Sequence, residues 1–351
     1  MKRRGYQALA LAGAAMLALS ACSTTGGGGG GGGTSTDGAK SGDVKPEDMS
    51  MVTVVKITGV GWFDRMEEGV KHFAETTGID ARQQGGDDAS PEKQIQIIQD
   101  LLPQNPTAIT VVPNSPESLE NVLGKARDQG IVVISHEAAG MKNVDADIEA
   151  FDNASYGRLI GQNLADCMGG KGQYAAFVGH LTAKTHMDWV SAALDYMKEK
   201  APGITRVSDP IESKEDEGVA YDRAKEILAK YPDIKGFQGS AGTDVAGIAR
   251  AVQEAGKQDS VCVMGTAIPS VAKKYLADGS IDKAFLWDPA LAGEAQLSAA
   301  KIIAEGGTIK EGTDLGVKGY ESLKAIEGTT NAFSGEATLV VDKNNVNDYN
   351  F

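Results

Sequence analysis

The sequence predicts an α/β protein of two doubly wound parallel-sheet lobes, joined by a hinge and separated by an interdomain cleft. Strand and helix signals alternate from residue 51 to residue 287, which is typical of parallel sheets covered by helices on both faces. The alternation restarts near Phe151-Asp152-Asn153, which indicates a second unit of the same kind. At 351 residues the chain also exceeds one typical hydrophobic core, so two lobes are expected.

The first 22 residues have the pattern of a targeting segment. Basic residues 2–4 precede an apolar run at 8–19, and Leu19-Ser20-Ala21 places small residues before Cys22. The alternative is a transmembrane anchor, but the apolar run is short for a bilayer. Residues 23–50 follow with eight consecutive glycines, which predicts a flexible tether.

The first lobe is predicted to begin with a buried strand at residues 52–57, a glycine turn at Gly59 and Gly61, and an amphipathic helix. Ser90 and Pro91 are a typical N-cap and first-turn pair for the next helix. The pattern continues with a strand at 108–112, a helix at 116–129 and a strand at 131–135.

The second lobe repeats this order. Helices are expected at 154–168, up to 200, 221–230, 244–255 and 269–277, and strands at 173–179, 204–207, 235–239, 261–265 and 283–287. Residues 337–341 form a separate β-branched run, which suggests an edge strand that crosses back. We therefore assign residues 51–150 plus 289–335 to the N-terminal lobe and residues 151–288 plus 336–351 to the C-terminal lobe.

Trp62 and Phe63 follow the first predicted strand, at the end where parallel sheets bind ligands. A flat aromatic side chain there can cover the C–H face of a sugar. Lys56 is unusual in an otherwise apolar strand, because its ammonium needs a polar partner. The alternative is that the aromatics are ordinary core residues and that Lys56 snorkels to solvent.

Other polar and aromatic residues also follow predicted strands. Thr243 or Asp244 alone could be a helix cap, and Trp287 could be hinge packing. Together these residues predict a site between the lobes. The candidate ligand-binding set is Lys56, Trp62, Phe63, His136, Glu137, Thr185, His186, Trp189, Ser240, Gly242, Asp244, Thr266, Trp287 and Asp288.

Several classes of function are disfavoured. The formal charge of −14 repels nucleic-acid backbones. His180, His186 and Asp188 lack a metal-ligand spacing, and no phosphate loop or nucleophile motif is present, so we expect neither a metal, a cofactor nor an enzyme. Cys167 and Cys262 are far apart in sequence among apolar or small neighbours, which favours buried free thiols over a disulfide.

At this point the chain resembles the solute-binding proteins of ABC importers, with the ribose/galactose-type (type I) periplasmic-binding fold. Residues 1–22 resemble a bacterial lipoprotein signal, which implies cleavage before Cys22 and its lipidation. The segments most similar to the rhamnose-binding and autoinducer-2-binding subgroup are 56–63, 134–138, 151–153, 286–289 and 342–351.

The resemblance implies that Lys56 binds ligand, that Trp62 and Phe63 cover it, that Glu137 is near the carboxylate after the fourth strand, and that Trp287-Asp288 lies at the hinge. The chain departs from the autoinducer-2 pattern at four positions. Thr185-His186 replaces Asp-Gln, and Ser240 and Gly242 replace Pro and Ala. A monosaccharide such as rhamnose is therefore favoured over autoinducer-2.

The expected function is capture of a pentose or hexose by lobe closure and delivery to membrane permease subunits. The protein is expected to be a monomer outside the cytoplasm, anchored to the cell membrane through Cys22, in a periplasm or on the outer face of the cytoplasmic membrane. A receptor that feeds chemotaxis or a sensor kinase is the alternative. A lacI-type regulator would need a helix-turn-helix where the signal and glycines stand, and a hydrolase would need paired carboxylates.

Overall fold

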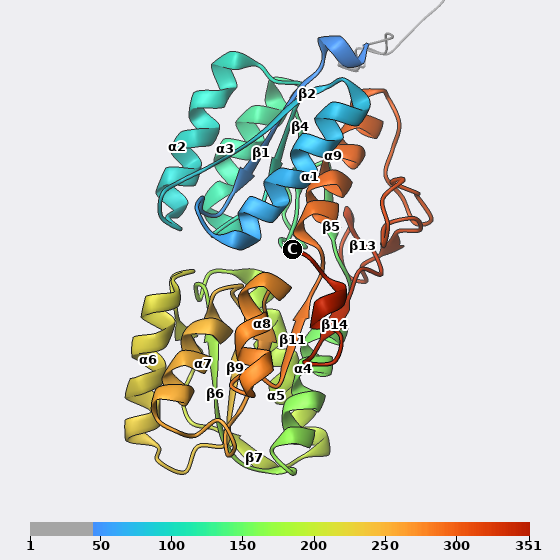
Figure 1. The fold of residues 1–351 in the computed structure, drawn as a ribbon. Helices are drawn as coiled ribbons and strands as arrows, with labels where there is room; N and C mark the ends of the chain where they lie inside the picture. Colours follow the sequence, from blue (N-terminus) through green and yellow to red (C-terminus); the bar gives the residue numbers. More distant parts are fainter. Residues whose placement is uncertain (1–44) are drawn as a thin grey trace, which may run out of the picture. The chain divides into compact units, whose positions relative to one another are not determined.

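The computed structural model describes residues 45–351, so the predicted signal segment, the lipidation site at Cys22 and most of the tether lie outside the described residues. Within the described part, no helix is both long and apolar enough to cross a bilayer. Two separate sheets, each flanked by helices, make up two α/β lobes (Figure 1). The predicted fold class is therefore confirmed.

The N-terminal sheet has the strand order β12-β13-β5-β4-β3-β1-β2, and all neighbours are parallel except β12 and β13. Its strands are β1 (Ser50–Val55), β2 (Asp80–Gly85), β3 (Ala108–Val111), β4 (Val132–Ser135), β5 (Ala146–Glu149), β12 (Lys324–Ala325) and β13 (Ala332–Ser334). Its helices are α1 (Gly61–Thr77), α2 (Pro91–Leu101), α3 (Pro116–Asp128) and α9 (Pro289–Ala304), with short 3₁₀ turns at η1 (Pro46–Asp48) and η2 (Leu102–Gln104).

The C-terminal sheet has the order β14-β11-β10-β9-β6-β7, with β8 paired to β6 off this path. Its strands are β6 (Lys171–Val178), β7 (Gly203–Arg206), β8 (Ile211–Glu212), β9 (Gly236–Gly239), β10 (Cys262–Thr266), β11 (Lys283–Leu286) and β14 (Leu339–Val341). The helices are α4 (Asn153–Cys167), α5 (Lys184–Lys200), α6 (Glu217–Lys230), α7 (Asp244–Glu254) and α8 (Pro269–Asp278), and η3 (Val346–Asp348) follows β14. As predicted, residues 339–341 form an edge strand, antiparallel to β11.

Helix starts follow the local sequence. The Ser90 hydroxyl accepts a hydrogen bond from the Lys93 amide, and Pro91 occupies the first helical position of α2. Asp152 caps α4 in the same way through the amide of Ser155. The central strands β1 and β3 are buried, and a core of their side chains and those of α2 and α3 fills one face of the N-terminal sheet.

The sequence did not predict five strands, β2, β5, β8, β12 and β13. Residues Asp80–Gly85 are polar and partly exposed at the sheet edge, so they show no apolar alternation. Strand β5 carries Asp147 and Glu149 in fully buried positions, where carboxylates conceal the strand pattern. The remaining three are only two or three residues long.

Three chain segments connect the lobes and form the hinge. They follow β5, β11 and β13, at residues 150–152, 287–288 and 335–338. Two of them run side by side, because the Ala337 amide donates to the Ala150 carbonyl at 2.9 Å. The lobes are thus joined along one side. The strand ends of the two sheets face each other across the gap beside this hinge.

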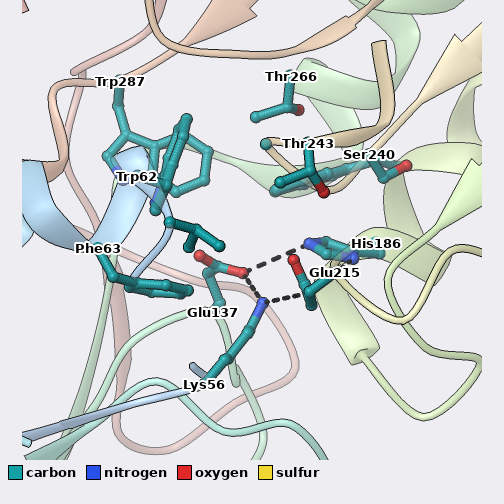
Figure 2. Close-up of a pocket in the computed structure, with 13 residues that line it drawn as sticks. Lys56, Trp62, Phe63, Glu137, His186, Glu215, Ser240, Thr243, Thr266 and Trp287 are labelled. Atoms are coloured by element: carbon teal, nitrogen blue, oxygen red, sulfur yellow. Dashed lines mark hydrogen bonds and ion pairs between the residues drawn. The ribbon is translucent and has the colours of Figure 1, made fainter. Parts of the chain in front are cut away.

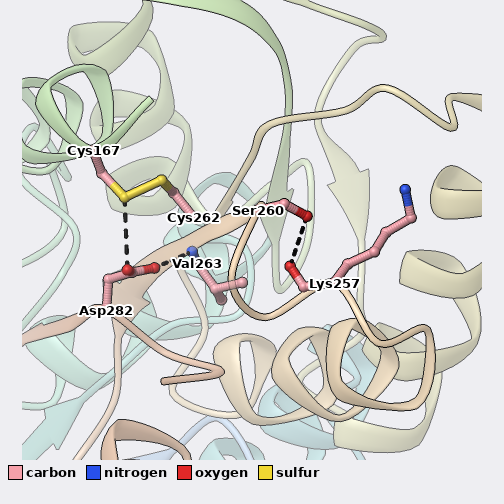
Figure 3. Close-up of a disulfide and its surroundings, with 6 residues drawn as sticks. All are labelled: Cys167, Lys257, Ser260, Cys262, Val263 and Asp282. Atoms are coloured by element: carbon pink, nitrogen blue, oxygen red, sulfur yellow. Dashed lines mark hydrogen bonds between the residues drawn. A yellow bond between two sulfur atoms is a disulfide. The ribbon is translucent and has the colours of Figure 1, made fainter. Parts of the chain in front are cut away.

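Cys167 and Cys262 form a disulfide, so the prediction of free thiols was wrong (Figure 3). The residues are 95 positions apart in sequence, but α4 packs on β10 and places their Cα atoms 6.2 Å apart. Cys167 is exposed at the end of α4, and Cys262 is buried at the start of β10. Sequence distance concealed this pairing because only the tertiary packing of α4 brings the two positions together.

Candidate functional site

A cavity lies between the lobes, where strands of both sheets end (Figure 2). Its lining comes from the loops that follow β1, β4, β8, β9 and β11, from the last residue of β10, and from the first turn of α1 and the first two turns of α5. The lining residues are Lys56, Val60, Trp62, Phe63, Glu137, His186, Trp189, Glu215, Ser240, Gly242, Thr243, Thr266 and Trp287.

Lys56 and Glu137 form a buried ion pair on the N-terminal side of the cavity. Strand β1 ends at Val55, so Lys56 begins the loop rather than standing inside the strand as predicted. Its Nζ lies 2.6 Å from Glu137 Oε2 and 3.8 Å from Glu215 Oε1, and the side chain is 3% exposed. Burial alone lowers the pKa of Lys56, but the neighbouring carboxylates outweigh it and raise that pKa. Lys56 is therefore charged and paired, and it does not snorkel to solvent.

His186 is a neutral hydrogen-bonding group on the C-terminal side. The Gly179 amide donates to Nδ1 at 3.1 Å, so the ring hydrogen is on Nε2, 3.7 Å from Glu137 Oε2. Burial, and then the charge of Lys56, hold the pKa of His186 well below its usual range. The imidazole thus directs a donor toward the charged pair without adding charge.

All three tryptophans of the chain line the cavity. Trp62 and Phe63 belong to the first turn of α1, not to a loop before it. The rings of Trp62 and Trp287 contact edge to face, with centroids 4.6 Å apart, and Trp189 is 5.8 Å from Trp287. The Trp189 indole N–H donates to Asn153 Oδ1 at 2.7 Å, which fixes its orientation.

Several polar atoms of the lining are buried without a hydrogen-bond partner in the protein. They are Trp287 Nε1, Glu215 Oε1, Ser240 Oγ and Thr243 Oγ1. A buried polar atom without a partner costs about 1–3 kcal/mol. A ligand rich in hydroxyl groups can supply such partners.

Four predicted site residues are near the cavity but do not line it. His136 donates its Nδ1 hydrogen to the Ile148 carbonyl at 2.6 Å and packs against Trp287. Thr185 Oγ1 lies 3.4 Å from Glu137 Oε2. The Asp244 carboxylate accepts hydrogen bonds from the amides of Ser240 and Ala241 at 2.9 Å each. His136, Thr185 and Asp244 therefore contact and position lining residues without lining the cavity themselves.

The fourth is Asp288, which has a structural role at the hinge. It accepts hydrogen bonds from the Ala290 amide at the start of α9 and from two nitrogens of Arg65, at 2.9 and 2.7 Å. The Arg65 guanidinium also stacks over the ring of Phe351, 4.5 Å from its centroid. The Phe351 carbonyl accepts from the Ser270 amide at the start of α8, so Arg65 of the N-terminal lobe contacts a tail that packs on the C-terminal lobe.

Three lining residues were not in the candidate set, Val60, Glu215 and Thr243, the last of which had been considered as a helix cap. Glu215 belongs to the acidic stretch Glu212–Glu217, whose charge predicts a solvated loop. Only the backbone conformation distinguishes Glu215 from an ordinary loop residue: Lys214 and Glu215 both have positive φ, 59° and 58°. Such a conformation cannot be recognised from the residue types alone.

The lobes contact each other across the cavity. A Cβ atom at Gly242 of the C-terminal lobe would lie 3.0 Å from Trp62 Cε3 of the N-terminal lobe. The Thr182 hydroxyl donates to the Asn114 carbonyl at 3.2 Å, again between lobes. The cavity is therefore enclosed by both lobes.

The periplasmic binding protein domain family matches residues 51–308, most of the described chain. The chain belongs to this family. The D-allose-binding periplasmic protein of Escherichia coli (strain K12) is 27% identical to this periplasmic binding protein over 252 residues, which cover 67% of this chain and 78% of the relative.

Solved structures share the fold. LsrB from Clostridium saccharobutylicum in complex with AI-2 has a TM-score of 0.79 and 22% identity, covering 86% of this chain and 100% of that one. An ABC transporter solute-binding protein from Clostridium phytofermentas with bound L-rhamnose has a TM-score of 0.80 and 21% identity, covering 86% and 98%. At these identities the structures establish the fold alone, and they match the subgroup that the sequence resembles.

Family membership confirms three of the sequence predictions. The protein has the type I periplasmic-binding fold, it acts outside the cytoplasm, and it is a substrate-binding protein and not an enzyme. An oxidising compartment also accounts for the disulfide.

Proposed function

We propose that this periplasmic binding protein captures a monosaccharide, a rhamnose-like pentose or hexose, between its lobes and delivers it to an ABC importer. The observation that carries the proposal is the composition of the cavity wall. Indole rings stand beside buried polar atoms that have no partner in the protein. A sugar presents both an apolar C–H face and hydroxyl groups, so it matches this wall.

The D-allose and L-rhamnose bound by a relative and a structural neighbour are both monosaccharides. These similarities support the class of ligand and leave the individual sugar to experiment.

Lobe closure is the proposed binding mechanism. A ligand drives closure only through contacts that the closed state alone makes. Ser240 and Glu215 come from the C-terminal lobe, whereas Lys56 and Trp62 come from the N-terminal lobe, so a bound sugar touches both lobes only when they approach. The three connecting segments at the hinge provide the axis for this motion.

We further propose that cleavage and lipidation at Cys22 anchor the protein to the membrane. The glycine-rich tether would then let a monomeric binding domain reach membrane permease subunits. Labelling with a radioactive fatty acid tests this proposal: the wild-type protein should incorporate label, and the Cys22→Ala variant should not.

Binding is tested by titration calorimetry and tryptophan fluorescence against L-rhamnose, D-allose, D-ribose, D-xylose and AI-2. Because every tryptophan lines the cavity, the bound sugar should change the emission in step with the calorimetric heat. Trp62→Ala should weaken binding about 10- to 100-fold through lost ring contact. Lys71→Ala, an exposed residue of the same helix, is the matched control and should bind normally. No saturable heat with any of these compounds would refute the proposal.

A receptor for autoinducer-2 or another sugar-like signal is the second candidate, because the structural neighbour LsrB was solved with AI-2. Thr185, His186, Ser240 and Gly242 depart from the autoinducer-2 pattern, which favours a monosaccharide. Deletion of the gene separates transport from sensing. In transport the strain loses uptake of the identified ligand, whereas in sensing it keeps uptake and loses the chemotactic or kinase response.

A further inference from the structure

Glu215 is held at the cavity by a strained backbone. It lies in the loop between β8 and α6, and both it and Lys214 adopt the left-handed conformation that side chains other than glycine rarely take. Each such residue costs about 1–2 kcal/mol. Hydrogen bonds from the amides of Ser213 and Lys214 to the Val178 and Gly179 carbonyls fix the loop. Strain that is held in this way at a ligand cavity points to a functional residue.

The neighbouring strand end is shaped to admit this carboxyl group. A Cβ atom at Gly179 would lie 2.2 Å from Glu215 Oε1, so only glycine leaves room for it. The side chain is 6% exposed. The backbone of the loop that carries Glu215 and the absence of a side chain at Gly179 together place the carboxyl group at the cavity.

No group of the protein satisfies Glu215 Oε1. Lys56 Nζ is 3.8 Å away and gives its short contact to Glu137 instead. His186 Nδ1 is 4.0 Å away and accepts a hydrogen bond from Gly179, so it cannot donate to the carboxyl group. Figure 2 shows Glu215 between Lys56 and His186, opposite Glu137. A ligand hydroxyl group can supply the missing partner for this oxygen.

The titratable groups that face Glu215 come from five other segments, namely the loops after β1, β4 and β6 and the helices α5 and α7. Lys56 and Glu137 neutralise each other on the N-terminal lobe. His186 on α5 and His180 in the loop after β6 are neutral, because burial lowers the pKa of both. Asp244 at the start of α7 is buried, and burial raises its pKa to about 6. Because Glu137 already neutralises Lys56, an ionised Glu215 would leave the cluster with a net negative charge. Burial outweighs the opposing charge of Lys56 and raises the pKa of Glu215 to about 7.

We infer that Glu215 is a specificity-determining residue that joins the complex as a neutral carboxylic acid and donates its O–H hydrogen to an oxygen of an uncharged sugar. The inference rests on the proposed function and narrows its ligand class. One proton is taken up when the ionised form of the free protein binds. Uncharged sugars are selected over sugar acids, because a ligand carboxylate would meet Glu137 and a Lys56 that is already paired.

Titration calorimetry from pH 5.5 to 9 in phosphate and in Tris, with the tightest sugar of the panel, tests the inference. Wild-type affinity should be constant at low pH and fall toward tenfold per pH unit above pH 7, with proton uptake seen as a buffer-dependent heat. Glu215→Gln keeps an N–H donor of the same shape, so its affinity at pH 6 should stay within about threefold while the pH dependence and the proton uptake disappear. Glu215→Ala should weaken binding at least tenfold at every pH.

Glu226→Gln, on the exposed face of α6, is the matched control and should keep the wild-type pH profile. A pH-independent wild-type affinity, or a folded Glu215→Gln protein that binds as poorly as Glu215→Ala, would overturn the inference while the sugar-binding function stands. No heat with any sugar at any pH would overturn the proposed function and this inference with it. Thermal melting of each variant confirms that a loss of binding is not a loss of fold.

Discussion

The two lobes have the same architecture but present different chemistry to the cavity. The N-terminal wall holds its charges in an internal pair, Lys56 with Glu137, and the Asn114 side chain donates to the Lys56 carbonyl at 3.0 Å. The C-terminal wall leaves Glu215, Ser240 and Thr243 with unpartnered oxygens. Among the lining residues, the unpartnered oxygens thus belong to the C-terminal wall, whereas on the N-terminal side the unpartnered Asn114 Oδ1 and His136 Nε2 belong to residues that do not line the cavity.

This difference bears on the proposed lobe closure. If the lobes close as proposed, closure without a ligand would leave the unpartnered oxygens of the C-terminal wall buried and unsatisfied, which disfavours it. The lobes differ in their scaffolds too, since the disulfide belongs only to the C-terminal lobe.

The largest effect is expected from removing the disulfide with Cys167→Ser and Cys262→Ser together. The cross-link spans 95 residues, and its loss should lower the free energy of unfolding of the C-terminal lobe by about 2–5 kcal/mol. Urea unfolding measures this change. Sugar affinity should stay the same at 25 °C, because neither cysteine lines the cavity; unchanged stability would contradict the assignment of a stabilising role.

Glu137→Ala tests the charged wall of the N-terminal lobe. Because Lys56 would keep a buried charge without its closest partner, the free energy of unfolding should fall by about 3 kcal/mol in urea unfolding. Glu47→Ala, at an exposed surface ion pair, is the control and should change it by less than about 1 kcal/mol. The double variant Lys56→Met, Glu137→Leu should regain stability but bind no sugar, and continued binding would refute a role for the pair in the site.

A buried carboxyl pair gives the N-terminal lobe a pH-dependent stability. Burial raises the pKa of Asp147 to about 7, and burial together with the charge of Asp147 raises that of Glu149 well above its usual range. The folded state thus holds protons that the unfolded state has released, so this stability is present at acidic pH and is lost as the pH rises through 7.

Between pH 5 and pH 7, Asp147→Asn should remove a slope of up to about 1.4 kcal/mol per pH unit in urea unfolding. Glu215 and Asp244 contribute a slope of the same sign in the other lobe, which this variant leaves in place. A slope identical to that of the wild type would show that the pair is not protonated.

The smallest effect is expected from Gly242→Ala, which tests contact between the walls. The added methyl group would press on Trp62 in the closed form, so sugar affinity should fall about tenfold in calorimetry. Stability should not fall, because the methyl group meets only the opposite lobe. Gly218→Ala on the exposed part of α6 is the control, and equal affinities of the two variants would argue against closure at this contact.

The sequence was sufficient for the lobes and for most of the cavity lining. Apolar periodicity revealed the buried strands and their helices, and the position of Trp62, Glu137 and Ser240 after predicted strands placed them at one edge. The sequence did not predict the segments in which charged residues are buried. Strand β5 with two carboxylates and the acidic loop of Glu215 both look solvent-exposed in sequence.

Contacts between segments far apart in the chain could not be predicted from the sequence either. Nothing near Cys167 or Cys262 indicates that α4 lies on β10. Asp288 was predicted to bind ligand, but it pairs with Arg65 instead. The sequence could not show this pairing, because it depends on the packing of α1 against α9. The tertiary structure decides such contacts, and residue types at fixed spacing do not.

The disulfide has a practical consequence for optical sensing. With Cys167 and Cys262 joined, residues 45–351 offer no free thiol to a maleimide dye. Leu181, 49% exposed and next to the contact between Thr182 and Asn114, could be replaced by cysteine and labelled alone. A dye at that rim would report on each opening and closing of the two halves without any modification of the recognition surface.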